Sequence, residues 1–389
     1  MKQAQVCIVG GGCVGLTLAL GLAKADISVV VLDGAPTQAL PTDEYGLRVS
    51  ALSIASQTLL EQLNVWPEII AQRACAYTHM DVRDADSFGK IAFNNEQLEL
   101  DHLGHIVEND IIRFALIKEL EQQSSVTLMF DTQYQQIHQS ESDVFITLKS
   151  GEPIIAKLLV AADGANSAIR KQFNMALSFK DYDHHALVAT VKTKEPHENT
   201  ARQVFLPTGP LAFLPLSDAN THSIVWSTSP YHCDELLAMD DNTFNKAVMA
   251  AIDGQCGLCE VQSKRTAFPL KMRYAQQWVS GKVVLIGDAA HTIHPLAGLG
   301  MNLGLKDAAY LIELLTSDSS KEFASTRTLR DYERTRKLDA QKHIAMMQGL
   351  KELFEGANPV KKLIRGVGLS LVDNLGPIKH LFAKEAIGK

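Results

Sequence analysis

Apolar runs of strand length flank a helical segment at the start of the chain. Residues 5–9 and 28–32 are largely apolar and end at turn residues, and residues 13–25 between them are rich in alanine and leucine. Short apolar runs bounded by turns predict buried strands, and a longer apolar segment predicts a helix. The order predicts a βαβ unit with both strands in one parallel sheet.

The middle of the chain carries weaker patterns. Residues 52–63 and 110–121 have helical periodicity, with Asn109 as the expected N-cap of the second helix. The segment between these two helices is mixed and poor in strand patterns. From residue 126 the pattern changes, and the turn at 150–152 separates two strand-like runs, which predicts a hairpin that returns to a buried strand.

Residues 186–268 contain short β patterns separated by Pro, Gly, Asn and Asp, and afterwards residues 282–286 form another buried strand and residues 300–315 a long helix. This order predicts an α/β fold in which a mostly antiparallel sheet domain interrupts a Rossmann-like domain. The nucleotide-binding domain is expected to be discontinuous, at 1–75, 100–180 and 270–330. The substrate-binding sheet domain is expected at 76–99 and 181–269, and a C-terminal helical region at 331–389.

Three glycines follow the first strand in G-x-G-x-x-G spacing, at Gly10, Gly12 and Gly15. The first glycine permits a tight turn, the second lets the backbone approach a pyrophosphate, and the third allows close packing of helix and strand. The helix start adds unpaired N–H groups that favour phosphate. Asp33 ends the second strand, where a carboxylate accepts hydrogen bonds from ribose hydroxyls. The context predicts a dinucleotide site.

Composition narrows the class of protein. The 389 residues are 46% hydrophobic and 21% charged, with a formal net charge of −7, and the isoelectric point is about 6.0. This length suits two domains. An acidic chain is a poor fit to a nucleic-acid binder, which normally presents a basic face.

Cysteine usage and the absence of long apolar runs predict a cytoplasmic protein. The six cysteines are scattered, which suits a reducing compartment, and the pair Cys256 and Cys259 has no second pair at zinc spacing, so we interpret it as incidental. The first strand begins too early for a signal peptide to precede it. No apolar run reaches the roughly 20 residues that span a bilayer, so any membrane contact is expected to be peripheral.

Two further strand ends carry acidic motifs, AADGANSAIR at 161–170 and GDAAHTIHP at 287–295. With these segments and the glycine motif in this order, the sequence resembles the group A FAD-dependent aromatic monooxygenases. That family combines the glycine motif, D-G-x-x-S-x-x-R, and G-D-A-A-H followed by P-x-x-G-x-G-x-N. The resemblance extends over nearly the whole chain, and it implies the fold of the p-hydroxybenzoate hydroxylase-like proteins.

The resemblance implies FAD as cofactor and assigns residues to it. Gly10, Gly12, Gly15 and Asp33 would bind the ADP half. Asp288 would hydrogen-bond the ribityl hydroxyls, and Asp163 with Gly164 would shape the groove that the flavin and the nicotinamide nucleotide both approach. The start of the long helix would direct its N–H groups to the pyrimidine edge of the flavin, with Arg48 beside the flavin. The remaining assigned residues belong to the third motif: Pro295, Gly298, Gly300, Met301 and Asn302.

The chain departs from the family pattern at two positions. Position 33 is Asp where many members carry Glu, which shortens the reach of the carboxylate, and Leu299 stands where Gln is usual. Both changes bear on detailed geometry and leave the backbone contacts to FAD intact. We interpret His291 and His294 as structural, because the cofactor supplies the oxidant in such enzymes.

Within the family the chain is similar to the ubiquinone-biosynthesis hydroxylases through HLGHIVEN, DYDHHALVAT, AFLPLSD and GDAAHTIHPLAG. The stretches DYDHHALVAT and ANPVKKLIR resemble those of the members that hydroxylate C5 of a 2-polyprenylphenol. The resemblance implies that NAD(P)H reduces FAD, that O2 adds to give a C4a-hydroperoxyflavin, and that one oxygen atom passes to the phenol ring. The sequence identifies no catalytic base.

Other functions stay open from the sequence. The chain is also compatible with a flavin hydroxylase of a soluble aromatic compound, with a flavin-dependent prenyl reductase, or with a non-catalytic prenyl-binding protein on the same scaffold. Residues 358–389 are basic and amphipathic, which is typical of a segment that lies on a membrane or a partner. The alternative is a helix pair packed on the body of the protein.

Overall fold

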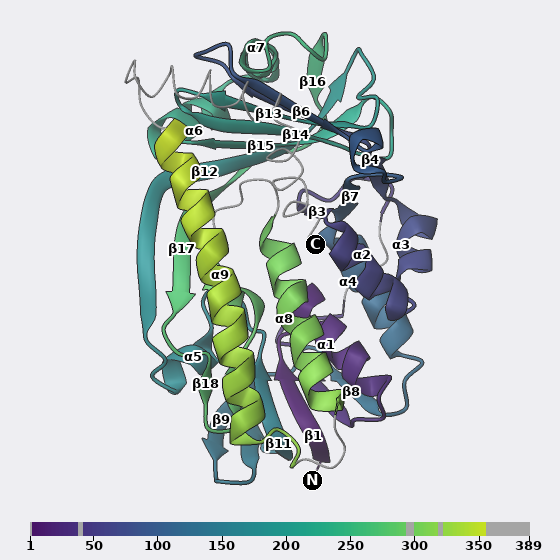
Figure 1. Cartoon of the computed structure of the whole chain (residues 1–389), viewed down its shortest axis with the longest axis vertical. Helices are drawn as coiled ribbons and strands as arrows, with labels where there is room; N and C mark the ends of the chain where they lie inside the picture. The colour runs from purple at the N-terminus through teal and green to yellow at the C-terminus, as the bar shows by residue number, and fades with distance from the viewer. Residues whose placement is uncertain (1, 38–41, 293–298, 318–321, 355–389) are drawn as a thin grey trace.

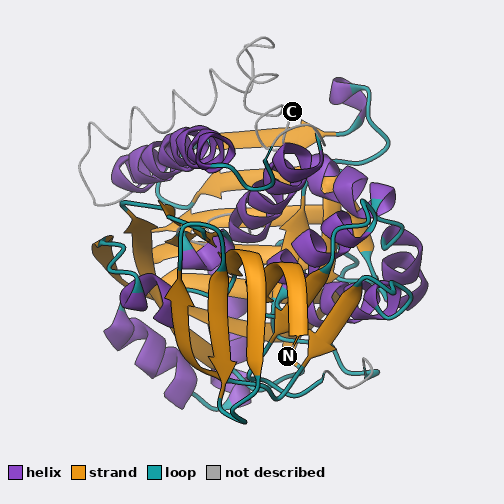
Figure 2. Ribbon diagram, turned by 90° about the horizontal axis from the view of Figure 1, so that it is seen from below, coloured by secondary structure: helices purple, strands orange, loops and turns teal. Residues whose placement is uncertain are grey.

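The computed structural model describes residues 2–37, 42–292, 299–317 and 322–354 (Figure 1). Within these ranges the chain forms an eight-stranded sheet, a nine-stranded sheet and a three-stranded sheet. Helices lie mostly around the outside of the strands (Figure 2). The fold is thus a mixed α/β architecture with two separate large sheets.

The eight-stranded sheet contains the predicted βαβ unit. Its parallel strands follow the order β19-β11-β1-β2-β8, so β1 lies at the centre with later strands on both sides. The strands of this sheet are β1 (Lys2–Val9), β2 (Val29–Leu32), β8 (Val126–Met129), β9 (Tyr134–Gln139), β10 (Val144–Leu148), β11 (Pro153–Ala161), β18 (Val279–Ser280) and β19 (Val283–Leu285). Ligands of such sheets bind beyond the carboxyl ends of the strands, where the strand order reverses.

Helices flank this sheet, and its central strands are buried. Both β2 and the second half of β1 are buried, as expected for parallel strands covered on both faces. The helices of this region are α1 (Cys13–Ala23), α2 (Ile54–Gln62), α3 (Trp66–Gln72), α4 (Asn109–Leu120), α5 (Ala168–Gln172), α8 (Leu299–Thr316) and α9 (Thr326–Phe354), with the short 3-10 turns η1 (Glu96–Leu98) and η2 (Gly287–Ala289).

The nine-stranded sheet lies above the first in Figure 1 and is antiparallel except for the pair β5 and β13. One of its faces packs on α6 (Pro230–Ala238) and α7 (Asp241–Ala251) through a separate apolar core. Its strands are β5 (His79–Asp84), β6 (Lys90–Asn94), β12 (Leu177–Thr193), β13 (Thr200–Leu206), β14 (Gly209–Pro215), β15 (Thr221–Thr228), β16 (Cys259–Val261), β17 (Thr266–Ala275) and β20 (His291–Thr292).

The small sheet lies near the place where the two large sheets meet (Figure 1). Its strands are β3 (Val49–Leu52), β4 (Cys75–Tyr77) and β7 (Gly104–Glu108), and the central strand β7 pairs antiparallel with both neighbours. Residues that point to one face of an antiparallel sheet alternate along each strand. Ala51 and Ile106 are register partners and therefore share a face.

One sequence prediction about the middle of the chain is wrong. The pattern between the second and fourth helices predicts few strands, but this segment forms β4, β5, β6 and β7. These strands find their partners far along the chain, since β5 pairs with β13 and β7 pairs with β3. Strands of three to six residues with charged positions, such as HMDVRD in β5, give no clear local periodicity.

The expected N-cap at Asn109 is also wrong by one position. Helix α4 begins at Asn109 and Glu108 is its N-cap residue, without a side-chain capping bond. The amide oxygen of Asn109 instead accepts a hydrogen bond of 2.6 Å from the Ser50 hydroxyl. The hairpin around Gly151 is confirmed, because β10 and β11 pair antiparallel across that turn.

Helix α9 packs on the nucleotide-binding sheet region rather than standing apart. Leu329 and Tyr332 belong to the same core as β1 and α1, and the Tyr332 hydroxyl donates to the Leu285 carbonyl at the end of β19. The six cysteines are free and buried. Among the described residues, no helix has the length and apolarity that crossing a bilayer requires. The amphipathic segment 358–389 lies outside the described residues.

A buried ion-pair network joins α8, α9 and η2. The Asp307 carboxylate has no exposed surface; it accepts from the Gly287 N–H at 3.0 Å, lies 2.6 Å from His291 Nε2, and accepts from Arg336 Nε at 2.8 Å. Desolvation opposes ionisation of Asp307, but His291 and Arg336 outweigh it and hold its pKa below the usual value. The network therefore favours the ionised carboxylate.

We predict that Asp307→Asn destabilises the protein by about 3 kcal/mol, the lower end for a broken buried pair, because Arg336 would lose its fully buried counter-ion and keep only the partly exposed Asp339. A carboxyl group with a depressed folded pKa stabilises above its unfolded pKa of about 3.9 and loses that contribution as the pH falls through the folded value. The loss should thus be full at neutral pH and shrink below pH about 4. Thermal unfolding across this pH range measures it.

The matched control is Asp331→Asn, which removes an aspartate paired with Arg334 on the surface of α9, the helix that also carries Arg336. An exposed pair of this kind contributes about 0–1 kcal/mol. Equal losses in both variants would contradict the assignment of Asp307 as the buried anchor.

Candidate functional site

The first strand-to-helix turn requires glycine for its own packing at two of its three motif positions. Gly10 has φ +114, and a Cβ there would lie 2.2 Å from the Ala162 carbonyl oxygen. A Cβ on Gly15 would lie 2.1 Å from the Gly10 carbonyl oxygen. The turn therefore lies directly against the end of β11, and neither position accepts a side chain.

Gly12 is different, because nothing in the described chain demands a glycine there. A Cβ at Gly12 would meet no heavy atom within 4 Å, and its backbone angles, φ −79 and ψ 173, suit any residue. Gly12 is the N-cap residue of α1, where unpaired N–H groups favour anions. Open backbone at a helix start fits the approach of the FAD pyrophosphate.

Asp33, the residue after β2, stabilises the same turn through hydrogen bonds. Its Oδ2 accepts from the Gly11 N–H at 2.7 Å and its Oδ1 accepts from the Ala35 N–H at 2.8 Å. Each carboxylate oxygen has a second acceptor position, so the group can also take a ribose hydroxyl. The shorter Asp thus holds the glycine loop as well as facing the predicted ribose position.

Arg113 belongs to this turn, although the sequence motifs do not single it out. Its Nε donates to the Gly11 carbonyl at 2.7 Å, and its Nη2 lies 3.9 Å from the Asp33 carboxylate. The guanidinium lies 5.3 Å from the centre of the Phe130 ring. In the sequence, the only indication of this role is that Arg113 is a charged residue within an otherwise apolar helical segment.

The second motif forms the turn after β11. Asp163 Oδ2 accepts from the Ala168 N–H at 2.8 Å at the start of α5, and its Oδ1 is buried without a hydrogen-bond partner among the described residues. Gly164 beside it has φ +78, and a Cβ there would have no atom within 4 Å. An acceptor that lacks a donor beside the Gly10 turn fits a bound group that carries hydroxyl or N–H donors.

Arg170 of the same motif ties the second motif to the third. It is buried, and it donates to the Ala165 carbonyl at 2.9 Å and to the Ala289 carbonyl at 2.7 Å. Burial lowers its pKa from the usual value, opposed by the nearby Asp163. Arg170 therefore acts as a structural link between two strand ends.

Asp288 lies in η2, the turn after β19, between the buried residues Gly287 and Ala289. Its side chain has accessible surface, yet protein atoms surround it so closely that desolvation raises its pKa above the usual value, against the effect of His291, Arg48 and Arg273. The position suits a carboxylate that accepts from the ribityl hydroxyls of FAD.

Arg48 lies directly before β3 and reaches across to the antiparallel sheet domain. Its guanidinium lies 5.0 Å from the centre of the Phe268 ring on β17, an attractive cation–π geometry. Its backbone carbonyl accepts from the Asn109 N–H. The charge of Arg48 also acts on Asp288, so the two side chains lie near each other.

The start of α8 is held by the side chain of Asn302. Its Oδ1 accepts from the Ser53 N–H at 2.9 Å and the Ser56 hydroxyl at 2.8 Å, and its Nδ2 donates to the Ala51 carbonyl at 2.8 Å. Both ends of the Asn302 amide are therefore bound to other residues of the protein. Asn302 would contribute to cofactor binding by positioning α8. Gly300 has no atom within 4 Å of a Cβ position, and Met301 packs on the central core.

The three motifs come together at the carboxyl ends of β1, β11 and β19, which are neighbours in the sheet. A Cβ on Gly10 would lie 2.9 Å from the Asp163 nitrogen, and one on Gly287 would lie 3.4 Å from Val14. Pro295 and Gly298 lie outside the described residues. In the described part of the chain no group of His, Cys, Asp and Glu side chains is arranged for a metal ion.

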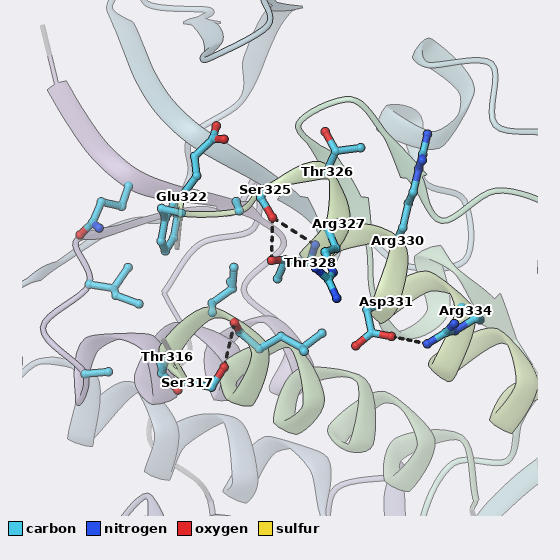
Figure 3. Close-up of a pocket in the computed structure, with 17 residues that line it drawn as sticks. Thr316, Ser317, Glu322, Ser325, Thr326, Arg327, Thr328, Arg330, Asp331 and Arg334 are labelled. Atoms are coloured by element: carbon cyan, nitrogen blue, oxygen red, sulfur yellow. Dashed lines mark hydrogen bonds and ion pairs between the residues drawn. The ribbon is translucent and has the colours of Figure 1, made fainter. Parts of the chain in front are cut away.

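A separate cleft of about 1140 Å³ lies toward the amino end of β1 and contains none of the motif residues (Figure 3). The ends of α8 and α9 line it, and several of its polar side chains pair with each other, including Asp331 with Arg334 and Ser325 with Thr328. The cofactor site and this cleft are therefore distinct.

The comparisons with known proteins agree with this geometry. A family model described as FAD binding domain matches residues 3–346. The 3-demethoxyubiquinol 3-hydroxylase of Escherichia coli (strain K12) is 34% identical over 393 residues, covering 100% of this chain and 99% of that protein. The mitochondrial ubiquinone biosynthesis monooxygenase COQ6 of Homo sapiens is 34% identical, covering 97% of this chain and 91% of that protein.

The chain belongs to the FAD-dependent hydroxylases of ubiquinone biosynthesis. It is therefore an FAD-dependent monooxygenase. The p-nitrophenol 4-monooxygenase PnpA of Pseudomonas putida DLL-E4 has the same fold, with a TM-score of 0.80 over 100% of this chain and 99% of that chain at 19% identity. A variant of HpxO from Klebsiella pneumoniae, complexed with FAD, matches with a TM-score of 0.75 at 17% identity, covering 98% of this chain and 99% of that chain.

We predict that Gly12→Ala lowers FAD affinity at least tenfold, about 1.4 kcal/mol, because the new methyl group occupies the space through which the pyrophosphate approaches the backbone. The fold should persist, since the methyl meets no protein atom. Titration of the apoprotein with FAD, followed by flavin fluorescence, measures the change.

Gly349→Ala is the control for this substitution. Gly349 lies in α9 and likewise has no atom within 4 Å of a Cβ position, so its variant should bind FAD as the wild type does. Unchanged FAD affinity in Gly12→Ala would show that the pyrophosphate does not lie at this turn.

Proposed function

We propose that this enzyme hydroxylates the aromatic ring of a polyprenylphenol intermediate of ubiquinone biosynthesis, using NAD(P)H and O2. The observation that carries the proposal is an apolar pocket beside the predicted flavin site. The pocket lies between the three-stranded sheet and the nine-stranded sheet, and its wall includes Val49 and Ala51. These two residues follow Arg48 on β3.

The pocket suits an aromatic ring. Its volume is about 100 Å³, the same order as the ~150 Å³ apolar cavity that holds benzene in another protein. Side chains from both sheets line it, and most of them are apolar. The lining residues are Val49, Ala51, Tyr77, Met80, Ile106, Ala201, Arg202, Gln203, Pro210, Ala212, Leu214, Val225 and Ser227.

The alternation of β14 explains how the nine-stranded sheet supplies this wall. Leu211 and Phe213 are buried in the core under α6 and α7, while Pro210, Ala212 and Leu214 face the pocket. Successive side chains of a strand point to opposite faces. The same sheet thus packs one face on its own helices and presents the other to the substrate.

The glycine turn, Asp33 and the start of α8 would hold FAD, which would supply the redox chemistry for activating O2. NAD(P)H supplies two electrons; one oxygen atom becomes the new ring hydroxyl and the other leaves as water. The residues of this chain bind, orient and exclude water. An apolar pocket wall keeps the reacting ring and its oxidant away from bulk solvent.

The relatives support a prenylated ring as substrate. The name of the Escherichia coli relative says that it acts on a demethoxyubiquinol, and Rhodospirillum rubrum has a ubiquinone hydroxylase, UbiL, that is 32% identical over 100% of this chain and 90% of that protein. The described pocket lining is mostly apolar, and its arginine, Arg202, donates to the His197 and Thr200 carbonyls, which favours a neutral phenol over a charged aromatic acid. The C5 position remains part of the prediction from sequence.

The decisive experiment supplies the FAD holoenzyme with NAD(P)H and a short-chain polyprenylphenol under labelled O2. We expect a product heavier by one labelled oxygen atom and no such product without O2. The anaerobic arm separates the hydroxylase from a prenyl reductase, which needs no O2. NAD(P)H oxidation without oxygen insertion would direct the search to a soluble aromatic substrate, and absence of any turnover would favour a prenyl-binding protein.

We also propose that residues 358–389 make a peripheral contact with the membrane that holds such a substrate. The basic and amphipathic composition of this segment supports it. Removing the residues after Asn358 should abolish flotation with anionic liposomes and leave FAD bound. Flotation that survives the truncation would place the contact elsewhere on the molecule.

A further inference from the structure

Tyr77 carries a hydroxyl group that the described protein leaves without a partner. The residue lies at the end of β4, is 6% exposed, and lines the apolar pocket. No described residue forms a hydrogen bond with its hydroxyl, and the hydroxyl oxygen is not among the fully enclosed unpaired atoms of the described residues, so it is open to the pocket. The pocket therefore contains a buried tyrosine whose polar end is available to a ligand.

The side chain of Tyr77 crosses the small sheet toward β3. Tyr77 is the register partner of Gly104 on β7. A Cβ on Gly104 would lie 2.8 Å from the Tyr77 hydroxyl oxygen and 2.5 Å from the Leu52 carbonyl oxygen. Glycine at position 104 therefore leaves the room in which the phenol ring of Tyr77 passes over β7.

That direction brings the hydroxyl toward the flavin side of the pocket. The end of β3 is the segment to which α8 is fastened, since Asn302 binds the Ala51 carbonyl and the Ser53 N–H. The start of α8 is predicted to face the flavin. Tyr77 thus lies at the boundary between the pocket and the cofactor site.

The other polar groups of the pocket are less well placed to donate a hydrogen bond to a ligand in it. Arg202 already donates to the carbonyls of His197 and Thr200. Gln203 on β13 and Ser227 on β15 lie in the opposite wall, on the nine-stranded sheet. The remaining wall is mostly apolar, so a ring oxygen that enters the pocket finds few donors.

We infer that the Tyr77 hydroxyl donates a hydrogen bond to the ring oxygen of the phenolic substrate and so determines which ring carbon faces the flavin. The inference rests on the proposed function and adds a specificity-determining residue to it. Burial raises the pKa of Tyr77 to about 12, so the hydroxyl keeps its proton at neutral pH and acts as a donor. Fixing one ring substituent fixes the position of all ring carbons.

The test compares 2-prenylphenol with prenylbenzene, which lacks the ring oxygen, as ligands of the oxidised FAD holoenzyme. Binding is followed by the change in flavin absorbance, so the readout does not depend on turnover. Wild type should bind the phenol about tenfold more tightly, and Tyr77→Phe should bind the two ligands equally within about twofold. Tyr77→Phe should also show more NAD(P)H oxidation without product, since the ring is less well oriented.

Two control variants keep the test specific. Tyr274→Phe removes the hydroxyl of another buried tyrosine, which belongs to the central core and not to the pocket, and Ser227→Ala removes the hydroxyl on the opposite pocket wall. Both should keep the preference for the phenol. FAD content of each variant confirms that the holoenzyme has formed.

The inference is overturned if wild type binds both ligands equally, a comparison that needs no variant, or if Tyr77→Phe keeps the preference. Loss of the preference in Ser227→Ala alone would assign the contact to the other wall. These results are independent of the oxygen-labelling experiment, whose failure would instead reject the proposed hydroxylation.

Discussion

The carboxylate of Asp307, which has no exposed surface, fixes helix α8 relative to the turn that carries Asp288. It binds the Gly287 N–H, His291 and Arg336 at the same time. Two cationic or hydrogen-bonding partners and a backbone donor compensate the cost of burying this charge. Because α8 starts about two turns before Asp307, the same contact also sets where the helix start lies over the predicted flavin position.

Asn302 extends this constraint from the cofactor site to the substrate pocket. Its amide holds the end of β3 and the N-terminal residues of α2, while β3 provides Val49 and Ala51 to the pocket wall and Arg48, the residue before β3, acts on Asp288. One short segment therefore serves both sites. A displacement of α8 would move the flavin side and the ring side together, which is how the distance between oxidant and ring can be kept constant.

Local sequence patterns predicted those parts of the structure that local physics determines. The βαβ unit, the hairpin at Gly151 and helix α8 follow from apolar runs and turn residues within a few positions. Strands β4 to β7 did not, because they are short and two of them, β5 and β7, pair with the distant strands β13 and β3. The contacts of Arg113 and of Asp307 with Arg336 join residues far apart in sequence, and the pocket exists only where two sheets face each other, so periodicity along one segment cannot indicate them.

Charge is distributed unequally between the two parts of the site. Arg48 and Arg273 both act on Asp288 where FAD is expected, whereas the pocket wall is mostly apolar, with Arg202 already bound to backbone carbonyls. Fixed charges and helix dipoles stabilise a charged cofactor without reorganisation during the reaction. An apolar wall instead holds a neutral ring and excludes the water that would consume the oxidant. In such a wall a single hydroxyl group has a large influence on orientation, because every pose that leaves the ring oxygen unpaired carries a high desolvation cost.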